Sequence, residues 1–231
     1  MRFTGHTWPE QLVATDVLMK NYEVPKYPTA YVMHPTYYTV MTPLAEPKLG
    51  ETSLWRFTIA QQPGDTRSAE ELAHPDHLRS LPRPLEYEII QASLYRIHQR
   101  LATTLRRGRC LLAGDAAHVN NPYGGLSLNT GILDASALAD ALEMILNEGR
   151  SEELLNIYSQ ERSKVFQKFV DPTNTYNKLR LHATDPETAA EEDWYFKALN
   201  SKDPAVAQEM AAPYFDTWPT DMRKLAAKRG L

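Results

Sequence analysis

The fold of this chain is decided by the stretch Cys110-Leu111-Leu112-Ala113-Gly114-Asp115-Ala116-Ala117-His118, which is followed by Pro122-Tyr123-Gly124-Gly125 and by Asn129. This order predicts a short buried strand, a Gly-Asp turn, a glycine-containing loop and then an apolar helix from about Leu126. A carboxylate and a cluster of backbone N–H groups then meet where the strand gives way to the helix. That end of an α/β sheet suits a polar, partly anionic cofactor.

The predicted strand 110–113 is almost continuously apolar, which is typical of a strand buried on both faces of a parallel sheet. Cys110, the only cysteine, is therefore expected to be a small buried hydrophobe. One cysteine cannot form an internal disulfide, so we expect a reducing, cytoplasmic location.

The helix predicted over 126–147 has an apolar stripe at helical spacing, ended by Gly149. Its members are Leu128, Ile132, Ala135, Leu138, Leu142 and Ile145. A second helix is expected from about Ser151, until Asp171-Pro172 kinks or ends it. Shorter and more polar helices follow from about residue 185.

The first half of the chain predicts strands, with one helix over residues 67–80. The expected strands cover residues 12–19, 31–34, 37–41, 54–60 and 87–95. The fold class is therefore α+β or α/β, with a mostly antiparallel sheet followed by one strand of parallel type and by C-terminal helices.

The central stretch resembles the second flavin-contacting motif of the FAD-dependent aromatic hydroxylases, the class A flavoprotein monooxygenases, which reads roughly GDAAH-x3-P-x2-G-x3-N. The resemblance extends to Thr7-Trp8-Pro9-Glu10, Tyr95–Arg100 and Asp171–Asn174, and covers about residues 1–182. It implies a substrate-domain-like sheet over 1–100, a partial FAD-domain strand, loop and helix over 101–148, and a helical region over 149–231.

The resemblance also implies which residues contact FAD. Asp115 would accept a hydrogen bond from a ribityl hydroxyl, because a carboxylate only accepts; the alternative is a capping role for the following loop or helix. Backbone groups at the helix start would approach the isoalloxazine edge. The expected cofactor-binding set is Asp115, Pro122, Gly124, Gly125, Leu126, Ser127, Leu128 and Asn129.

Other candidates are weaker. Arg96, His98 and His118 are weak candidates for catalytic residues, because a strand-end arginine and packed histidines explain them better. Tyr37, Tyr38, Trp55 and Phe57 are candidate substrate-binding residues, although most aromatic side chains on such strands belong to a core. Asp171 and Asn174 fit a break and restart of a helix. The scattered histidines predict no metal site.

The implied activity is a FAD- and NAD(P)H-dependent monooxygenase that hydroxylates an aromatic or polyketide-like small molecule in secondary metabolism. However, no three glycines fit G-x-G-x-x-G and no Asp-Gly dipeptide occurs, so the ADP-binding half of the site is missing from this sequence. Strand 110–113 would then lose its parallel neighbours and expose an apolar face.

Three alternatives follow from the missing half. The chain is a cofactor-free isomerase, cyclase or dehydratase derived from the family, a non-catalytic subunit that completes a separate flavin-domain partner, or a gene fragment. A homodimer is a further possibility. The net charge of −4 and the lack of a long apolar run argue against nucleic-acid and membrane partners.

Overall fold

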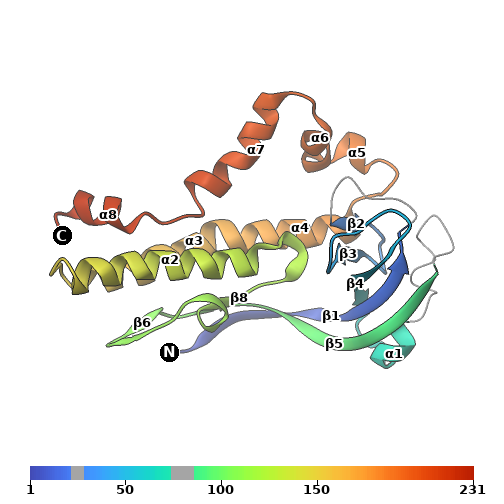
Figure 1. The fold of residues 1–231 in the computed structure, drawn as a ribbon, viewed down its shortest axis with the longest axis horizontal. Helices are drawn as coiled ribbons and strands as arrows, with labels where there is room; N and C mark the ends of the chain where they lie inside the picture. Colours follow the sequence, from blue (N-terminus) through green and yellow to red (C-terminus); the bar gives the residue numbers. More distant parts are fainter. Residues whose placement is uncertain (22–28, 74–85) are drawn as a thin grey trace. The chain divides into compact units, whose positions relative to one another are not determined.

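The computed structural model of the protein describes residues 1–21, 29–73 and 86–231 (Figure 1). These residues form two compact units, and each is described by itself. Unit 1 comprises residues 1–6, 98–178 and 190–231; unit 2 comprises 7–97 and 179–189. The family resemblance predicts domain boundaries at residues 100 and 148, which mark the parts of the related enzymes. These boundaries stay a prediction.

Unit 2 is built on a curled sheet with the strand order β2-β3-β4-β1-β5. The strands are β1 (Phe3–Lys20), β2 (Ala30–Val32), β3 (Thr39–Pro43), β4 (Thr52–Gln61) and β5 (Tyr87–Ala102). The β2–β3, β3–β4 and β1–β4 pairs are antiparallel. The mostly antiparallel sheet predicted from the alternating sequence is thereby confirmed.

The core of unit 2 lies on one face of this sheet. Val17 is paired with Trp55, and Thr15 with Phe57, so their side chains share that face. Trp55 and Phe57 are buried, and the Trp55 indole Nε1–H donates to Asn21 Oδ1 at 3.0 Å. A buried indole with a satisfied N–H is a stable core element.

One short helix, α1 (Ala69–Leu72), follows the sheet strand β4. Ser68 caps it, and the Glu71 carboxylate accepts from the Ser68 backbone N–H in a capping box. The start of the predicted 67–80 helix is therefore present. Its residues 74–80 lie outside the described residues.

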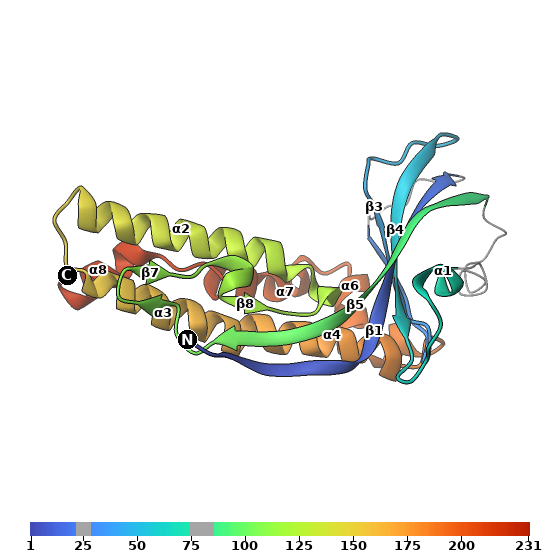
Figure 2. The same cartoon turned by 90° about the horizontal axis from the view of Figure 1, so that it is seen from below.

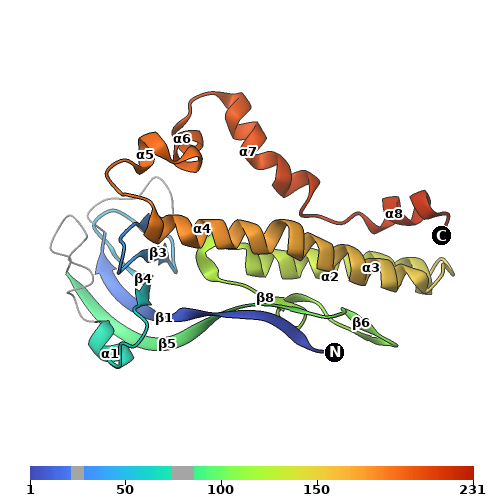
Figure 3. The same ribbon diagram turned by 180° about the vertical axis from the view of Figure 1, so that it is seen from behind.

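Unit 1 is built around a long helical pair. The helix bounds are α2 (Leu126–Leu146), α3 (Glu153–Val165), α4 (Asp171–Ala183), α5 (Ala189–Glu192), α6 (Trp194–Asn200), α7 (Pro204–Asp216) and α8 (Met222–Arg229). Helices α2 and α3 run side by side (Figures 1 and 3), and α8 packs against both. Their shared core includes Ala137, Ala141, Tyr158 and Met222. None of the described helices combines the length and hydropathy needed to cross a bilayer.

Between α3 and α4 the helix changes its hydrogen bonding. Residues Phe166–Val170 form a π-helical turn, and α4 begins at Asp171. Pro172 has no N–H to donate back into the preceding turn, which explains why regular α-helical bonding stops there. The interruption predicted at Asp171-Pro172 therefore takes the form of a π turn followed by further helix.

The prediction for strand 110–113 was wrong in two respects. Strand β7 contains only Cys110–Leu111, and it pairs antiparallel with β6 (Arg106–Arg107) in a separate hairpin. Cys110 is exposed instead of buried. Among the described residues β7 pairs with β6 alone, so the parallel neighbours that would cover a doubly buried strand are missing here (Figure 2).

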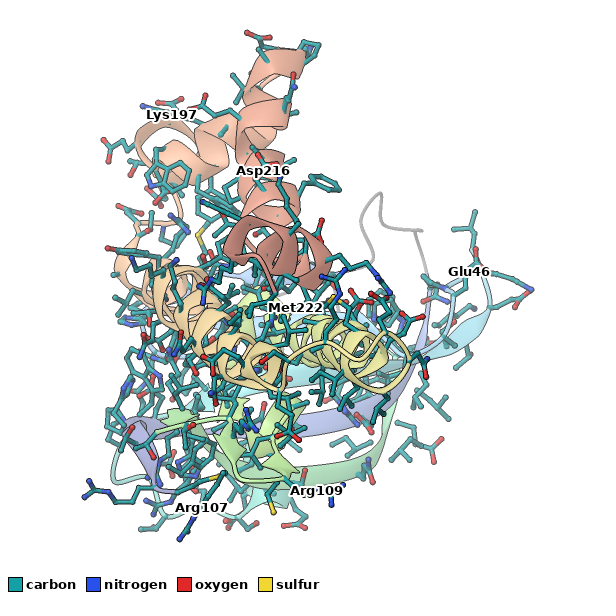
Figure 4. The ribbon with its side chains drawn as sticks, turned by 90° about the vertical axis from the view of Figure 1, so that its left-hand side faces the viewer. Glu46, Arg107, Arg109, Lys197, Asp216 and Met222 are labelled. Atoms are coloured by element: carbon teal, nitrogen blue, oxygen red, sulfur yellow. The ribbon has the colours of Figure 1, made fainter. Side chains whose placement is uncertain are left out.

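The hairpin formed by β6 and β7 carries exposed arginines at the second position of β6 and in its turn. Arg107 and Arg109 are both exposed, and their side chains point away from the ribbon (Figure 4).

The predicted core stripe of α2 was wrong for its first three members. Leu128 is 75% exposed and Ile132 56% exposed, and Ala135 is exposed as well. The buried positions of the helix are Leu126, Thr130, Asp134, Ala137, Ala141 and Met144. This face turns toward α3 and α8, and small or polar side chains allow the close packing. Of the predicted stripe, Leu138, Leu142 and Ile145 are partly buried against the core of unit 1, whereas the first three members are exposed.

Candidate flavin site

The turn that carries Asp115 is a 3-10 helix, η2 (Gly114–Ala116). Asp115 is exposed, and its carboxylate forms no hydrogen bond with any residue that the structure describes. The N-caps of η2, of the next 3-10 turn and of α2 are Ala113, Asn121 and Gly125, so Asp115 caps none of them. An exposed carboxylate without an internal partner is free to accept from a ligand.

The loop before α2 is a second 3-10 turn, η3 (Pro122–Gly124). Asn121 caps it by accepting from the Tyr123 N–H at 3.0 Å. Gly125 follows with φ +63°, the left-handed region that favours glycine, and contributes no side-chain cap to α2. The first N–H groups of a 21-residue helix are therefore uncapped by any side chain at this position.

The space in front of Gly125 is open. A Cβ atom added there would meet no heavy atom of the described residues within 4 Å. Leu128 and Asn129 on the first turn of α2 are exposed as well, whereas Leu126 is buried and Ser127 is half-buried and bonded to Asn120. The uncapped helix start is thus accessible to an anionic or acceptor group.

A buried amide network fixes this loop from behind. The Asn121 side-chain Nδ2 donates to Gln99 Oε1 at 2.9 Å and to the Asn174 carbonyl at 3.0 Å. Gln99 Nε2 in turn donates to Asp171 Oδ1 at 2.7 Å. The loop before α2 is therefore tied to β5 and to α4 within unit 1.

A second buried network lies on the other side of the turn. His118, on β8 (His118–Val119), is 1% exposed and forms a 2.6 Å bond with Asp134 of α2. Asp134 also pairs with Arg162 of α3 at 2.6 Å, and both of these side chains are fully buried. His118 is thus a packed histidine, stacked on Phe166, and it also bonds to a carboxylate, which was not expected.

Sequence reasoning missed Asp134 and Arg162. The available signal was periodic: Leu126, Thr130 and Asp134 are each four residues apart, which places one carboxylate on the same face as small and apolar residues. A charged residue on such a face requires a buried partner, and Arg162 in the middle of α3 provides it.

The remaining candidates are distributed over both units. Arg96 is exposed on the unit 2 part of β5, whereas His98 is half-buried on its unit 1 part. In unit 2, the Tyr38 hydroxyl donates to Glu10 Oε1 at 2.9 Å, and Tyr37 stacks on His34. Trp55 and Phe57 lie in the sheet core. The catalytic and substrate roles of all these residues stay predictions.

The residues present in unit 1 fit a flavin. Asp115 provides an exposed acceptor, the start of α2 provides exposed donors, and both sit on turns held by buried networks. No cluster of three or more His, Cys, Asp or Glu suited to a metal ion occurs among residues 1–21, 29–73 and 86–231.

Comparison with known proteins gives a consistent result. The family model described as FAD binding domain matches residues 12–173. Para-nitrophenol 4-monooxygenase of Pseudomonas sp. (strain WBC-3) is 35% identical over 234 residues, which cover 99% of this chain and 54% of the relative. 6-Hydroxy-3-succinoylpyridine 3-monooxygenase HspB of Pseudomonas putida is 33% identical, covering 83% of this chain and 48% of the relative.

Solved structures agree in fold. The crystal structure of p-nitrophenol 4-monooxygenase PnpA from Pseudomonas putida DLL-E4 has a TM-score of 0.80 and 34% identity, covering 95% of this chain and 55% of that one. Aklavinone-11 hydroxylase shares the fold with a TM-score of 0.65. The chain spans about half the length of the curated relatives it matches. The chain belongs to the FAD-binding-domain family of FAD-dependent aromatic hydroxylases, the class A flavoprotein monooxygenases.

Proposed function

We propose that this chain supplies the ribityl and isoalloxazine side of the flavin site in a FAD- and NAD(P)H-dependent aromatic hydroxylase. The observation that carries the proposal is the exposed Asp115 carboxylate on η2 together with the uncapped, exposed start of α2 in the same unit. The substrate class is a small phenol or hydroxylated heteroaromatic ring, in keeping with the names of the relatives, with larger polyketide-like rings as the wider class.

When bound, FAD reduced by NAD(P)H supplies the chemistry that transfers an oxygen atom to an electron-rich ring. The chain's own residues bind and orient the cofactor. Asp115 accepts a hydrogen bond from a ribityl hydroxyl. The N–H groups and positive dipole end of α2 stabilise negative charge on the reduced flavin.

The test is a flavin titration of the purified chain, followed by flavin fluorescence. Because this sequence lacks the glycine-rich motif that holds ADP, riboflavin, FMN and FAD should bind with dissociation constants within a few fold of one another. A folded chain, verified by circular dichroism, that binds none of the three would overturn the proposal. NADPH-dependent hydroxylation of p-nitrophenol tests the activity separately.

A second candidate function is that of a subunit completing a separate flavin-domain partner. The exposed apolar residues Leu128, Ile132 and Leu146 on α2 favour it. Monomeric proteins seldom expose several large apolar side chains along one helix, and such residues often mark a protein–protein interface. Its test is light scattering of the chain mixed with the part of para-nitrophenol 4-monooxygenase that the match leaves uncovered. A stoichiometric complex that retains FAD supports this function, and two separate species exclude it for that partner.

A further inference from the structure

Asp134 lies at the centre of a buried cluster that contacts η2, the turn that carries Asp115. Its Oδ2 accepts from the Gly114 backbone N–H at 3.0 Å and from His118 Nε2 at 2.6 Å. Its Oδ1 accepts from Arg162 Nε at 2.6 Å. Because an ionised carboxylate only accepts, His118 carries its hydrogen on Nε2.

The carboxylate remains ionised despite its burial. Burial is the largest influence on the pKa of Asp134 and raises it, but the hydrogen bond from His118 and the charge of Arg162 together bring the pKa below its ordinary value. Arg162 is anchored in turn, because its Nη1 donates to the Trp218 carbonyl at 2.7 Å and to Thr220 Oγ1 at 3.0 Å. The Asp134 carboxylate is therefore held in place by β8 and α3 directly, and through Arg162 by the segment that precedes α8.

The cluster acts on the residue next to the proposed flavin acceptor. Gly114 directly precedes Asp115 and has φ +59°, so its N–H direction determines where the turn places the Asp115 carboxylate. The turn also packs closely on α2: a Cβ at Gly131 would lie 3.1 Å from the Gly114 Cα. One hydrogen bond and one backbone contact thus fix η2 against the helix whose start would hold the flavin.

We propose that Asp134 and His118 are positioning residues, which hold the turn Gly114–Ala117 so that Asp115 and the start of α2 face the same flavin. His118 acts through Asp134: its hydrogen bond, with that of Arg162, orients the carboxylate toward the Gly114 N–H. Its ring is also stacked on Phe166, with centroids 5.0 Å apart. The proposal rests on the proposed flavin-binding function, but its structural part is testable without flavin.

The test compares His118→Phe with His118→Gln. Phenylalanine keeps a ring against Phe166 but removes the donor, whereas the glutamine Nε2 reaches as far as the histidine Nε2 and restores it. Two readouts are measured: amide hydrogen exchange of the peptide spanning residues 113–118, and the dissociation constant for riboflavin. Ser159→Ala is the matched control, because it removes another buried hydrogen bond of unit 1, the one that Ser159 accepts from the Leu105 N–H.

We expect His118→Phe to speed exchange in 113–118 at least tenfold and to weaken riboflavin binding about tenfold. His118→Gln should recover most of both effects, and Ser159→Ala should lower thermal stability with neither effect. Unchanged exchange in His118→Phe, or equal losses in the Phe and Gln variants, would overturn the positioning role.

If the wild-type chain binds no flavin, the proposed function fails, and the exchange comparison still decides whether the cluster holds the turn. If His118→Phe does not fold, a His118→Gln protein with wild-type exchange and affinity supports the role, and one that has lost both contradicts it.

Discussion

Gly124 and Asn174 are in direct contact across the loop that precedes α2. A Cβ atom built on Gly124 would overlap the Oδ1 atom of Asn174, which is fully buried. The Asn174 carboxamide forms no side-chain hydrogen bond within the described part of the chain, although its backbone carbonyl accepts from Asn121. Position 124 must therefore be glycine because of a neighbouring side chain, and not because of its own φ angle.

Gly124→Ala should accordingly destabilise unit 1 by about 1–3 kcal/mol, the usual cost of forcing an extra methyl group into a packed site. The measurement is the free energy of urea unfolding. The double variant Gly124→Ala/Asn174→Ala should recover most of the loss, because it removes the overlapping carboxamide. Additive losses in the double variant would contradict the assigned contact.

Gly131→Ala provides a test of how closely η2 packs on α2. Inside a helix this substitution normally stabilises by about 1 kcal/mol. Here the added Cβ would lie 3.1 Å from the Gly114 Cα, and the Gly114 N–H is held by Asp134. We therefore expect the opposite sign, a loss of about 1 kcal/mol in urea unfolding.

Ser136→Ala on the exposed side of α2 is the control, and it should raise stability by a few tenths of a kcal/mol. If Gly131→Ala raises stability as an alanine at an exposed helix position does, η2 is not packed closely against α2.

The sequence predicted the features of unit 1 that depend on local spacing. The Gly-Asp turn, the loop with Gly125 and the helix start at Leu126 all follow from residues within about 25 positions of one another, and turn and helix-start chemistry is local. The antiparallel sheet was predictable for the same reason, because alternation along β4 marks a half-buried strand.

The burial predictions that were wrong or missing depended on partners far along the chain. Cys110 and Leu128 were expected to be buried because apolar residues usually are, but burial requires a neighbouring element, and among the described residues none covers them. The buried carboxylate of Asp134 was missed for the opposite reason. A carboxylate on a helix is normally solvated, and the burial of this one depends on partners from other elements, Arg162 28 residues later and His118 16 residues earlier.

In unit 2, Asp16 and Arg56 predict a pH dependence of stability. They pair across β1 and β4 through two hydrogen bonds of 2.7 and 2.8 Å, and Gln91 also donates to Asp16. The hydrogen bond from Arg56 is the main cause that lowers the pKa of Asp16 below its ordinary value of 3.8. A lowered pKa in the folded state means that this stabilisation is complete above pH 3.8 and is lost as the pH falls through the folded pKa.

Arg56→Met should therefore cost about 1 kcal/mol at pH 7, a modest value because the Arg56 side chain is 43% exposed and screened by water. The difference between variant and wild type should shrink as the pH is lowered from 5 toward 2, measured by urea unfolding at each pH. Lys48→Met, at an exposed position of the same unit, should show no such convergence. A pH-independent difference would mean that Arg56 stabilises through packing alone.

Asp115 separates ligand binding from stability. Its carboxylate is exposed and has no hydrogen-bond partner within the described part of the chain, so Asp115→Ala should leave the free energy of unfolding within about 0.5 kcal/mol of wild type. The same variant should weaken riboflavin binding at least about tenfold, because a hydrogen bond to a charged acceptor contributes about 1.5–3 kcal/mol. The riboflavin dissociation constant of Asp115→Asn should lie between those of wild type and Asp115→Ala, since its amide oxygen still accepts a hydrogen bond while its charge is gone.

Asp216→Ala is the matched control, since Asp216 is an exposed carboxylate at the end of α7, outside the turn and the start of α2 (Figure 4). It should bind riboflavin as wild type does. Equal weakening by both substitutions would show that the chain attracts flavin through its general charge. A loss of stability in Asp115→Ala that accounts for the weaker binding would show that Asp115 supports the turn itself. Weaker binding with unchanged stability in Asp115→Ala alone would leave the carboxylate as a direct acceptor for the flavin.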